Sequence, residues 1–280
     1  MKFLIFVLVL VILAELLLLA LQCRRGHGEL RILQLYRYAH RGFHDKPQIP
    51  ENSMPAFRRA IEAGFGAELD VHLMKDGQLA VIHDSSLRRT AGASVCVEDL
   101  TAAELAQYRL EGTEEHIPLF SEVLALFSGK TPLIVELKSA GGNSAALTEA
   151  TCALLDQYPQ VRYCIESFDP FCLRWLKKHR PEIVRGQLST QMLREDPGKE
   201  HSRLTYFLLS NLLFNFLSQP DFVAYQFSHR QCLALTLCRR IYRVQEVSWT
   251  IRSMAELRSA EAAGAIPIFE TFDPRQEEKA

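Results

Sequence analysis

AELDVHL, residues 67–73, is the stretch that decides which fold this sequence predicts. It has the length of a β-strand, and it places two carboxylates, Glu68 and Asp70, among apolar neighbours that extend from Phe65 to Leu73. Side chains two positions apart on a strand face the same way, so the two carboxylates project together. The apolar setting favours a buried strand over an exposed sheet edge. The stretch therefore predicts an inner strand that carries a pair of acids on one face.

Eight further apolar stretches of strand length occur along the chain. They are YRYAH (36–40), LAVIHD (79–84), PLIVELK (132–138), RYCIESF (162–168), IVRGQL (183–188), DFVAYQF (221–227), EVSWTI (246–251) and IPIFETF (266–272). Helical patterns separate many of them, at 53–63, 102–108, 145–157, 171–179 and 254–263. This alternation indicates a parallel sheet covered by helices. About eight such units favour a (β/α)8 TIM barrel, with a doubly wound open sheet as the alternative. Since nine strands are counted, we predict that 221–227 is accessory.

The composition is that of an ordinary globular protein. The 280 residues carry a net charge of −1 at pH 7, and 48% of them are hydrophobic. A nucleic-acid-binding protein usually carries a basic excess, so we expect no nucleic-acid partner. The seven cysteines are odd in number and include no CxxC pair. They indicate reduced thiols rather than a disulfide framework or a zinc site.

The N-terminus is the exception to this composition. Residues 3–21 contain one polar residue, Glu15, and match the length of about 20 apolar residues that crosses a bilayer. A cleaved signal peptide is the alternative, but its apolar region usually runs only about 7–15 residues. We therefore predict a transmembrane anchor at 1–23, a linker at 24–35 and a barrel domain at 36–280.

The charges that flank the apolar run predict its orientation. Lys2 precedes it, whereas arginines follow it at 24, 25, 31 and 37. The positive-inside rule places the more basic flank in the cytoplasm. We expect a single-pass protein of the cell membrane, held through residues 3–21, with the main domain on the cytoplasmic side.

Reactive side chains gather at the ends of the predicted strands, where the active sites of TIM barrels lie. They are His40, Arg41, Glu68, Asp70, His83, Asp84, Glu136, Lys138 and Trp249. Three carboxylates that converge on one interior repel each other unless a cation neutralises them, and hard oxygen ligands suit Mg²⁺ or Ca²⁺. Two imidazoles can act as general base and general acid, while an arginine and a lysine neutralise phosphoryl oxygens. The set suits metal-dependent cleavage of a phosphodiester.

Short motifs in a fixed order carry a family resemblance. They are HRG (40–42), PEN (50–52), ELD (68–70), KDGQLAVIHD (75–84), RT (89–90), IPLFSEVL (117–124), VELK (135–138), SF (167–168) and WT (249–250). In this order and spacing they resemble the glycerophosphodiester phosphodiesterase family. The resemblance implies a metal-dependent TIM-barrel enzyme that hydrolyses glycerophosphodiesters to an alcohol and glycerol 3-phosphate. A lysophospholipase D or phospholipase-type activity on an acylated substrate, such as a lysophospholipid, is the alternative.

The resemblance also implies roles for individual residues: an acid/base pair, the ligands of one divalent cation (Mg²⁺ or Ca²⁺), and substrate contacts. The acid/base pair is His40 and His83. The cation ligands are Glu68, Asp70 and Glu136. The substrate contacts are Arg41, Lys138 and Trp249. Glu51 matches a carboxylate that either contacts the metal or holds Arg41. The chain departs from the family in ETFDP (270–274), where Phe272 is inserted into the turn after the last strand.

Two other features have a less direct connection with this chemistry. The stretch 204–217, LTYFLLSNLLFNFL, is uncharged and too short to span a bilayer. It forms either a buried packing helix or a hydrophobic lip that touches the membrane. We assign no function to His72, which we expect to lie out of phase with Glu68 and Asp70 and to face the outer helices.

Overall fold

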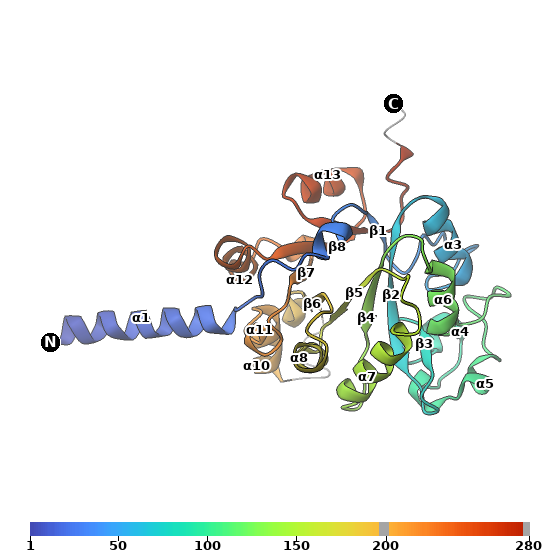
Figure 1. Ribbon diagram of the computed structural model, residues 1–280, viewed down its shortest axis with the longest axis horizontal. Coiled ribbons are helices and arrows are strands. Elements are labelled where there is room, and N and C mark those ends of the chain that lie inside the picture. Colours follow the sequence, from blue (N-terminus) through green and yellow to red (C-terminus); the bar gives the residue numbers. More distant parts are fainter. Residues whose placement is uncertain (196–201, 277–280) are drawn as a thin grey trace.

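Eight parallel strands close into a barrel in the computed structural model, which describes residues 1–195 and 202–276 (Figure 1). They are β1 (Tyr38–Ala39), β2 (Gly66–Leu73), β4 (Leu133–Leu137), β5 (Tyr163–Ser167), β6 (Arg185–Ser189), β7 (Phe222–Gln226), β8 (Gln245–Ile251) and β9 (Ile266–Phe269). Neighbours in this order are hydrogen-bonded, and β9 pairs back with β1. This closure confirms the predicted TIM barrel and excludes the doubly wound open sheet.

The accessory strand is β3 (Leu79–Val81) and not the stretch at 221–227. That stretch forms β7, which lies between β6 and β8 in the barrel, so the prediction that it is accessory is wrong. β3 pairs antiparallel with the far end of β2, where Leu73 lies opposite Leu79. Gly77, in the turn between them, has the left-handed φ of +82° that glycine adopts readily. An apolar stretch reads the same in either strand direction, so its sequence did not reveal the hairpin.

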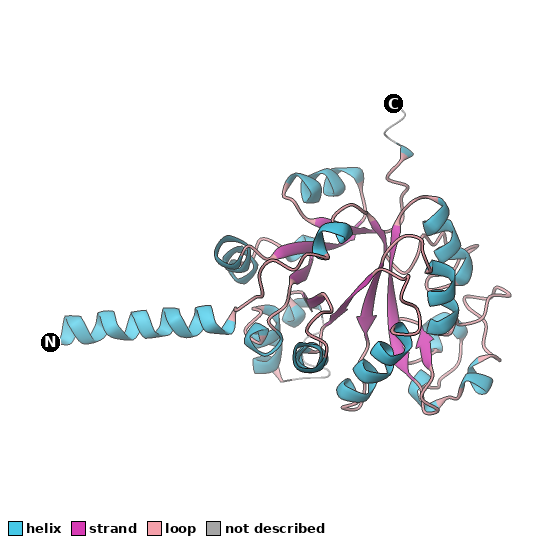
Figure 2. Ribbon diagram, viewed as in Figure 1, coloured by secondary structure: helices cyan, strands magenta, loops and turns pink. Residues whose placement is uncertain are grey.

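Helices cover the outside of the barrel (Figure 2). They are α3 (Met54–Glu62), α6 (Phe120–Phe127), α7 (Ser144–Leu155), α8 (Pro170–His179), α11 (Asn215–Ser218), α12 (Leu233–Leu237) and α13 (Met254–Ala262). α3 begins where the sequence predicts, because the Ser53 hydroxyl accepts a hydrogen bond from the Ala56 N–H at 3.3 Å. Pro55 occupies its first turn, where a proline removes no hydrogen bond.

Shorter elements occupy the connections. They are α2 (Leu30–Leu33), α4 (Arg88–Ala91), η1 (Val97–Asp99), α5 (Ala102–Leu105), α9 (Met192–Glu195), α10 (Arg203–Ser210), η2 (Phe227–His229) and η3 (Cys238–Tyr242). The apolar stretch 204–217 forms α10 and α11, which are separated by Leu212 at φ +57°. Tyr206 in α10 is buried, whereas Phe207 beside it is 50% exposed. The stretch therefore packs on the barrel with one side and leaves the other open.

Large apolar side chains fill the barrel interior below the strand ends. Tyr38, Ile134, Phe222 and Ile268 are fully or almost fully buried there. A Cβ on Gly66 would lie 2.5 Å from the Tyr38 ring, so only glycine leaves room for that ring. Because this end of the lumen is filled, polar chemistry is confined to the carboxyl ends of the strands.

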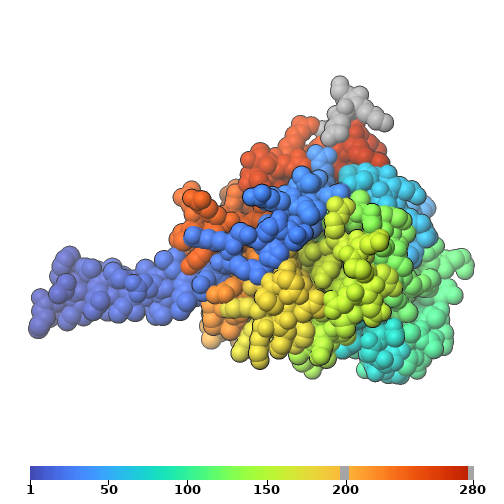
Figure 3. Space-filling model, viewed as in Figure 1, coloured from blue at the N-terminus to red at the C-terminus, as the bar shows by residue number. Residues whose placement is uncertain are grey.

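Helix α1 (Lys2–Ala20) projects away from the barrel (Figures 1 and 3). Among the described residues it is the one helix long and apolar enough to cross a membrane, and none of its residues is buried. A signal sequence passes the same test of length and composition. Its end is attached to the barrel: Leu21 is fully buried, and the Tyr242 hydroxyl donates to the Leu18 carbonyl at 2.6 Å.

Candidate functional site

Three buried carboxylates lie together at the carboxyl ends of β2 and β4. Asp70 of β2 lies opposite Glu136 of β4 in the sheet register, and Glu68 is on the same face as Asp70. One oxygen from each of the three lies within 4.8 Å of the other two. Burial and the neighbouring acids raise the pKa of Glu68, as burial does for Glu136. This set of hard oxygen donors, held close at an electrostatic cost, fits a divalent cation such as Mg²⁺ or Ca²⁺.

Two cationic side chains flank the carboxylates. Lys138 Nζ lies 2.7 Å from Glu136 Oε1 and 3.1 Å from Asp70 Oδ1. Although burial opposes it, these two carboxylates raise the pKa of Lys138 above its ordinary value, so the amine stays charged. Arg41 Nε lies 3.6 Å from Asp70 Oδ2, and the Arg41 backbone N–H donates to Glu68 at 3.0 Å. The two cations therefore partly neutralise the cluster and face the same space.

The turn after β1 places these groups through its backbone. Arg41 and Gly42 have φ of +55° and +79°. A Cβ on Gly42 would lie 2.9 Å from the Ala56 Cβ in helix α3, so glycine is required both for the conformation and for the close approach. The Asn52 N–H donates to the Arg41 carbonyl at 2.9 Å, and the Asn52 amide donates to Asp70 at 2.8 Å. The HRG and PEN segments are thus one interlocked unit.

Glu51 lies behind Arg41 and outside the cavity lining. It accepts hydrogen bonds from Arg41 at 2.8 Å, from Arg89 at 2.6 Å and from Lys46 at 2.6 Å. Although burial opposes it, these cations, with Arg89 foremost, lower the pKa of Glu51 below its usual range. Of the two roles left open by the sequence, these contacts favour the one in which Glu51 holds Arg41.

His40 is held by a carboxylate at the end of β9. Its Nδ1 lies 2.5 Å from Glu270 Oε2, and its Nε2 lies 3.9 Å from Glu68 Oε2. Arg252 Nε donates to the other Glu270 oxygen at 2.8 Å. Burial lowers the pKa of His40 to about 4. The imidazole is therefore fixed through Nδ1, and Nε2 is the nitrogen on the side of the carboxylate cluster.

His83 is held by a second arrangement of the same kind. Its Nδ1 lies 2.6 Å from Asp84 Oδ1, and Arg89 Nε donates to Asp84 Oδ2 at 2.6 Å. The hydrogen bond with His83 is the largest effect that lowers the pKa of Asp84 below its usual range. The β2–β3 hairpin brings His83 to this position, because the Ile82 N–H donates to the Asp70 carbonyl at 3.1 Å.

His72 supports the hairpin and does not face the outer helices, so our expectation for it is wrong. It is two residues beyond Asp70 on β2 and therefore shares the face of Glu68 and Asp70. One ring nitrogen lies 2.7 Å from Glu98 Oε1, and the other lies 3.2 Å from the His83 carbonyl oxygen. β2 continues past its pairing with β4, so residue 72 meets the hairpin instead of the lumen.

A cavity of about 190 Å³ joins these groups. Its lining consists of His40, Arg41, Glu68, His83, Glu136, Lys138, Glu166, Phe168, Leu188, Trp249 and Ile268. The structure thus brings the predicted histidines, cations, tryptophan and two of the three acids to one space, and Asp70 lies just behind it. Trp249 packs edge-to-face on Phe168 with ring centroids 5.8 Å apart, which makes the apolar wall of this cavity.

Two acids of the site were missed by the sequence reasoning. Glu166 lies opposite Glu136 in the register of β5 and β4, and burial raises the pKa of its carboxyl. Its position in RYCIESF, at the end of a predicted strand, was a usable signal. Glu270 follows the last strand, but nothing in the sequence indicates that it contacts His40, which is 230 residues away.

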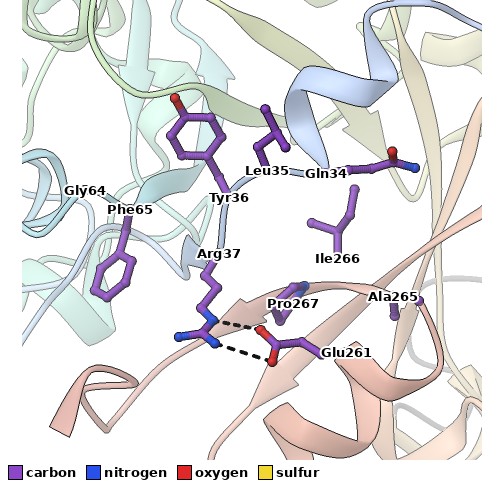
Figure 4. Close-up of a pocket in the computed structure, with 11 residues that line it drawn as sticks. Gln34, Leu35, Tyr36, Arg37, Gly64, Phe65, Glu261, Ala265, Ile266 and Pro267 are labelled. Carbon is purple, nitrogen blue, oxygen red and sulfur yellow. Dashed lines mark hydrogen bonds and ion pairs between the residues drawn. The ribbon is translucent and has the colours of Figure 1, made fainter. Parts of the chain in front are cut away.

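A larger hollow of about 550 Å³ lies at the opposite end of the barrel (Figure 4). It is lined by residues that precede β1 and β2 and by residues at the start of β9, among them Tyr36, Phe65 and Pro267. Its acidic residue, Glu261, forms an ion pair with Arg37 at 2.7 Å. Among the described residues that line it, the hollow holds no pair of imidazoles or group of carboxylates, so the smaller cavity is the candidate site.

Comparisons with known proteins agree with this site. A family model described as the Glycerophosphoryl diester phosphodiesterase family matches residues 40–271. The glycerophosphodiester phosphodiesterase of Caldanaerobacter subterraneus subsp. tengcongensis is 34% identical over 190 residues, which cover 65% of this chain and 77% of that protein. The Lysophospholipase D GDPD1 of Rattus norvegicus is 36% identical over 121 residues, covering 39% of this chain and 37% of that protein.

Solved structures share the fold. A phosphodiesterase from Oleispira antarctica, solved in complex with the product sn-glycerol 3-phosphate, superposes with a TM-score of 0.69 at 24% identity and covers 87% of this chain and 95% of that one. A glycerophosphodiester phosphodiesterase from Thermotoga maritima gives a TM-score of 0.63 at 22% identity, covering 84% and 94%. At these identities the likeness concerns the barrel itself.

Proposed function

Because the chain belongs to the glycerophosphoryl diester phosphodiesterase family, we propose that it hydrolyses glycerophosphodiesters to an alcohol and glycerol 3-phosphate with the help of one divalent cation, Mg²⁺ or Ca²⁺. The observation that carries the proposal is the cavity where His40 and His83 meet the carboxylate cluster. General acid/base groups, cationic groups and a cation site in one space are what the cleavage of a phosphodiester requires.

The proposed cation ligands are Glu68, Asp70 and Glu136, whose oxygens are already close together. When bound, the cation would supply positive charge that neutralises the phosphoryl oxygens. Lys138, which is paired with two of these carboxylates, is close enough to serve the same phosphoryl group. Arg41 offers a planar guanidinium for the same purpose, and Glu51 keeps it in place.

The proposed reaction uses one imidazole as base and the other as acid. The base accepts a proton from the attacking water, whose oxygen forms a bond to phosphorus. The acid gives a proton to the alcohol oxygen as the bond between that oxygen and phosphorus breaks. Glu270 and Asp84 each occupy the Nδ1 of one imidazole, so Nε2 of both His40 and His83 is left for these transfers.

The proposed glycerol pocket is the part of the cavity beside Trp249. Trp249 and Phe168 offer an apolar wall to the carbon chain of the glycerol unit. A volume of about 190 Å³ suits a small polar group and leaves the alcohol moiety to extend through the open mouth. We accordingly expect the enzyme to accept several head groups.

The test of this function is a phosphodiesterase assay on glycerophosphocholine with the full chain. We expect activity to vanish on chelation and to return with Mg²⁺ or Ca²⁺. His40→Ala should lower kcat by at least about 10²-fold, since an acid/base group contributes roughly 10²–10⁴. Glu68→Ala should lower kcat as well, because it removes a proposed ligand of the cation. His116→Ala, a partly exposed histidine outside the cavity, is the matched control. Activity that survives chelation and both site substitutions would overturn the mechanism.

A second candidate is a lysophospholipase D activity, in which the substrate keeps an acyl chain. It is supported by the exposed apolar side of α10, which follows β6 at the catalytic end of the barrel. Comparing kcat/KM for glycerophosphocholine and for a lysophospholipid under the same conditions separates the two. A clear preference for the lysophospholipid would establish the second candidate in place of the first.

We also propose that α1 anchors the enzyme in the cell membrane with the barrel in the cytoplasm. The length and apolar composition of α1 and the arginines that follow it support this arrangement. Protease digestion of sealed cells and of inverted vesicles tests it. The cytoplasmic face of the membrane is the outer face of inverted vesicles, so protease should cleave the barrel there and leave it intact in sealed cells. Cleavage in sealed cells alone would reverse the orientation.

A further inference from the structure

The end of α1 is fixed on the barrel by several contacts. Arg24 forms a two-pronged ion pair with Asp221, with distances of 2.5 and 2.7 Å. Arg25 donates to the Ile241 carbonyl, and Leu21 packs with Val223 and Leu235 in one apolar cluster. These contacts attach the chain that directly follows α1 to the barrel. They therefore fix which side of the barrel lies next to α1.

Exposed apolar side chains concentrate on that side. Beyond α1, the described residues include seven large hydrophobic side chains that are clearly exposed, and five of them belong to α10, α11, α12 and η3. We call these five the apolar face: Leu204, Phe207, Phe216, Leu233 and Ile241. In Figures 1 and 3, α10, α11 and α12 lie around the end of α1 that joins the barrel. Tyr242 of η3 hydrogen-bonds to Leu18 of α1. A clustering of this kind marks an interaction surface and is unlike the single apolar residues scattered on ordinary surfaces.

The same part of the chain is almost free of negative charge. Residues 201–245 contain one acid, Asp221, and it is buried against Arg24. Arginines occur in this segment at 203, 230, 239, 240 and 243, and Arg240 and Arg243 are exposed next to Ile241. A segment that combines exposed apolar side chains with arginines and contains no exposed acid is complementary to an anionic lipid bilayer.

We propose that the apolar face rests on the surface of the bilayer into which α1 inserts. The proposal depends on the anchor, and it goes beyond it: the barrel has one fixed orientation on the membrane instead of moving freely at the end of a tether. Interfacial side chains of this kind enter the headgroup and acyl boundary by about 5–10 Å. Arg240 and Arg243 then lie at the level of the phosphates.

This orientation places the catalytic rim beside the membrane. α9 and α10 follow β6, and the Ser189 hydroxyl at the end of β6 donates to the Leu209 carbonyl in α10 at 2.9 Å. The Met192 N–H donates to the Ser210 hydroxyl at 3.0 Å. The apolar face is thus continuous with the rim around the cavity. A lipid-derived phosphodiester can approach the site along the membrane surface.

Tryptophan quenching in vesicles tests the proposal with the full chain. Phe207→Trp and Leu233→Trp each place one fluorophore in the apolar face, and the parent chain supplies the background of Trp175 and Trp249. The matched control is Leu35→Trp, since Leu35 is 79% exposed and lies outside the apolar face. Vesicles contain phosphatidylglycerol and phosphatidylcholine, with bromine near the carbonyl end of the acyl chains. We expect the added fluorescence at 207 and 233 to be quenched and that at 35 to be unaffected.

Equal quenching at all three positions, or none at 207 and 233, would overturn the proposal, and so would a chain that does not float with the vesicles. Replacing the anionic lipid by phosphatidylcholine should weaken quenching at 207 and 233. Arg240→Ser with Arg243→Ser should remove that dependence on lipid charge, whereas Arg88→Ser, an exposed arginine on α4, should leave it. Quenching is independent of catalysis, so failure of the phosphodiesterase assay would not affect this result.

Discussion

Glu270 illustrates how single residues prepare the site. It lies 2.5 Å from His40 Nδ1 and is itself held by Arg252. Asp84 and Arg89 stand in the same relation to His83. Although burial opposes it, the hydrogen bond with His40 lowers the pKa of Glu270, so a negative charge faces the imidazole. In both pairs the carboxylate fixes the ring and its tautomer, and the arginine fixes the carboxylate.

Replacing Glu270 by Gln should therefore lower kcat while KM stays nearly constant. The amide still accepts a hydrogen bond but no longer stabilises the positive charge that a proton brings to His40. We expect a loss of about 10- to 100-fold, less than the roughly 10²–10⁴ that a complete acid/base group provides. Steady-state kinetics on glycerophosphocholine measure it. Asp273→Asn, whose carboxylate pairs with Arg275, is the control. A rise in KM without a change in kcat would contradict this positioning role.

Gly42 makes a second prediction at this scale. Gly42→Ala imposes a left-handed backbone on a Cβ, at about 1–2 kcal/mol, and forces that Cβ against Ala56, at about 1–3 kcal/mol more. Gly77→Ala is the matched control, because its φ of +82° is similar and its Cβ would meet open space. Urea unfolding in mild detergent should show the larger destabilisation for Gly42→Ala. Equal losses would mean that the contact with α3 is not limiting.

The β2–β3 hairpin is the element that completes the site. β2 extends beyond the barrel, and the chain turns at Gly77 and returns as β3. His83 follows β3 and lies beside Asp70. Glu98 in η1 holds this arrangement through His72 at 2.7 Å and the Ser85 hydroxyl at 2.6 Å. An element that is accessory to the barrel thus carries one of the two proposed catalytic histidines.

The charge of Glu98 should make part of the stability dependent on pH. Although burial opposes it, hydrogen bonds from His72 and Ser85 lower the pKa of Glu98 below its ordinary value of 4.5. The unfolded chain then binds the proton more readily, so this contribution is complete above the unfolded pKa and disappears as pH falls through the folded one. We expect Glu98→Gln to be less stable than the parent at pH 7 and the difference to close under acid conditions.

Thermal unfolding of both chains across pH measures this difference. Glu114→Gln, which replaces an exposed acid between β3 and β4, should have the stability of the parent at neutral and at acid pH. A stability difference between the parent and Glu98→Gln that stays constant down to acid pH would contradict this prediction, because it would not depend on the charge of Glu98.

On the scale of the whole molecule, the barrel holds buried carboxylates at the carboxyl ends of its strands, and their mutual repulsion opposes folding. Burial and neighbouring acids raise the pKa of Glu68 and of Glu166, whereas the end of the lumen below them is filled by apolar side chains. The stability of the fold and the proposed chemistry are therefore opposed at this point. A bound cation would relieve that opposition.

Glu68→Gln should change the melting temperature in opposite directions with and without the cation. Under chelation it removes one charge from a repulsive cluster and should raise Tm. With Mg²⁺ or Ca²⁺ the parent gains stability by mass action, about 2.7 kcal/mol at a hundredfold excess over Kd, and the variant gains less. Calorimetry under both conditions checks this, with exposed Glu62→Gln as control. Identical cation responses of the parent and Glu68→Gln would exclude Glu68 as a ligand.

Much of the fold and the site was predictable from local patterns. The two-residue period of 67–73 predicted that Glu68 and Asp70 share a face, and the helical pattern at 53–63 predicted α3. Both signals depend on neighbours in the chain, which a sequence shows directly. The site residues could be assembled because strand ends of a parallel barrel meet at one rim, so a list of strand ends is also a list of neighbours in space.

The sequence by itself therefore determined the barrel, the composition of its reactive rim and an N-terminal helix apolar enough for a membrane. Only the tertiary structure decided that β7 closes the barrel while β3 turns back, that His72 supports His83, that Glu270 holds His40, and that Glu51 lies behind Arg41. It also placed the elements that carry the apolar face beside the end of α1 that joins the barrel. The physical reason is the same in each case: these contacts join residues through packing and strand direction, and neither is written in the local order of the side chains.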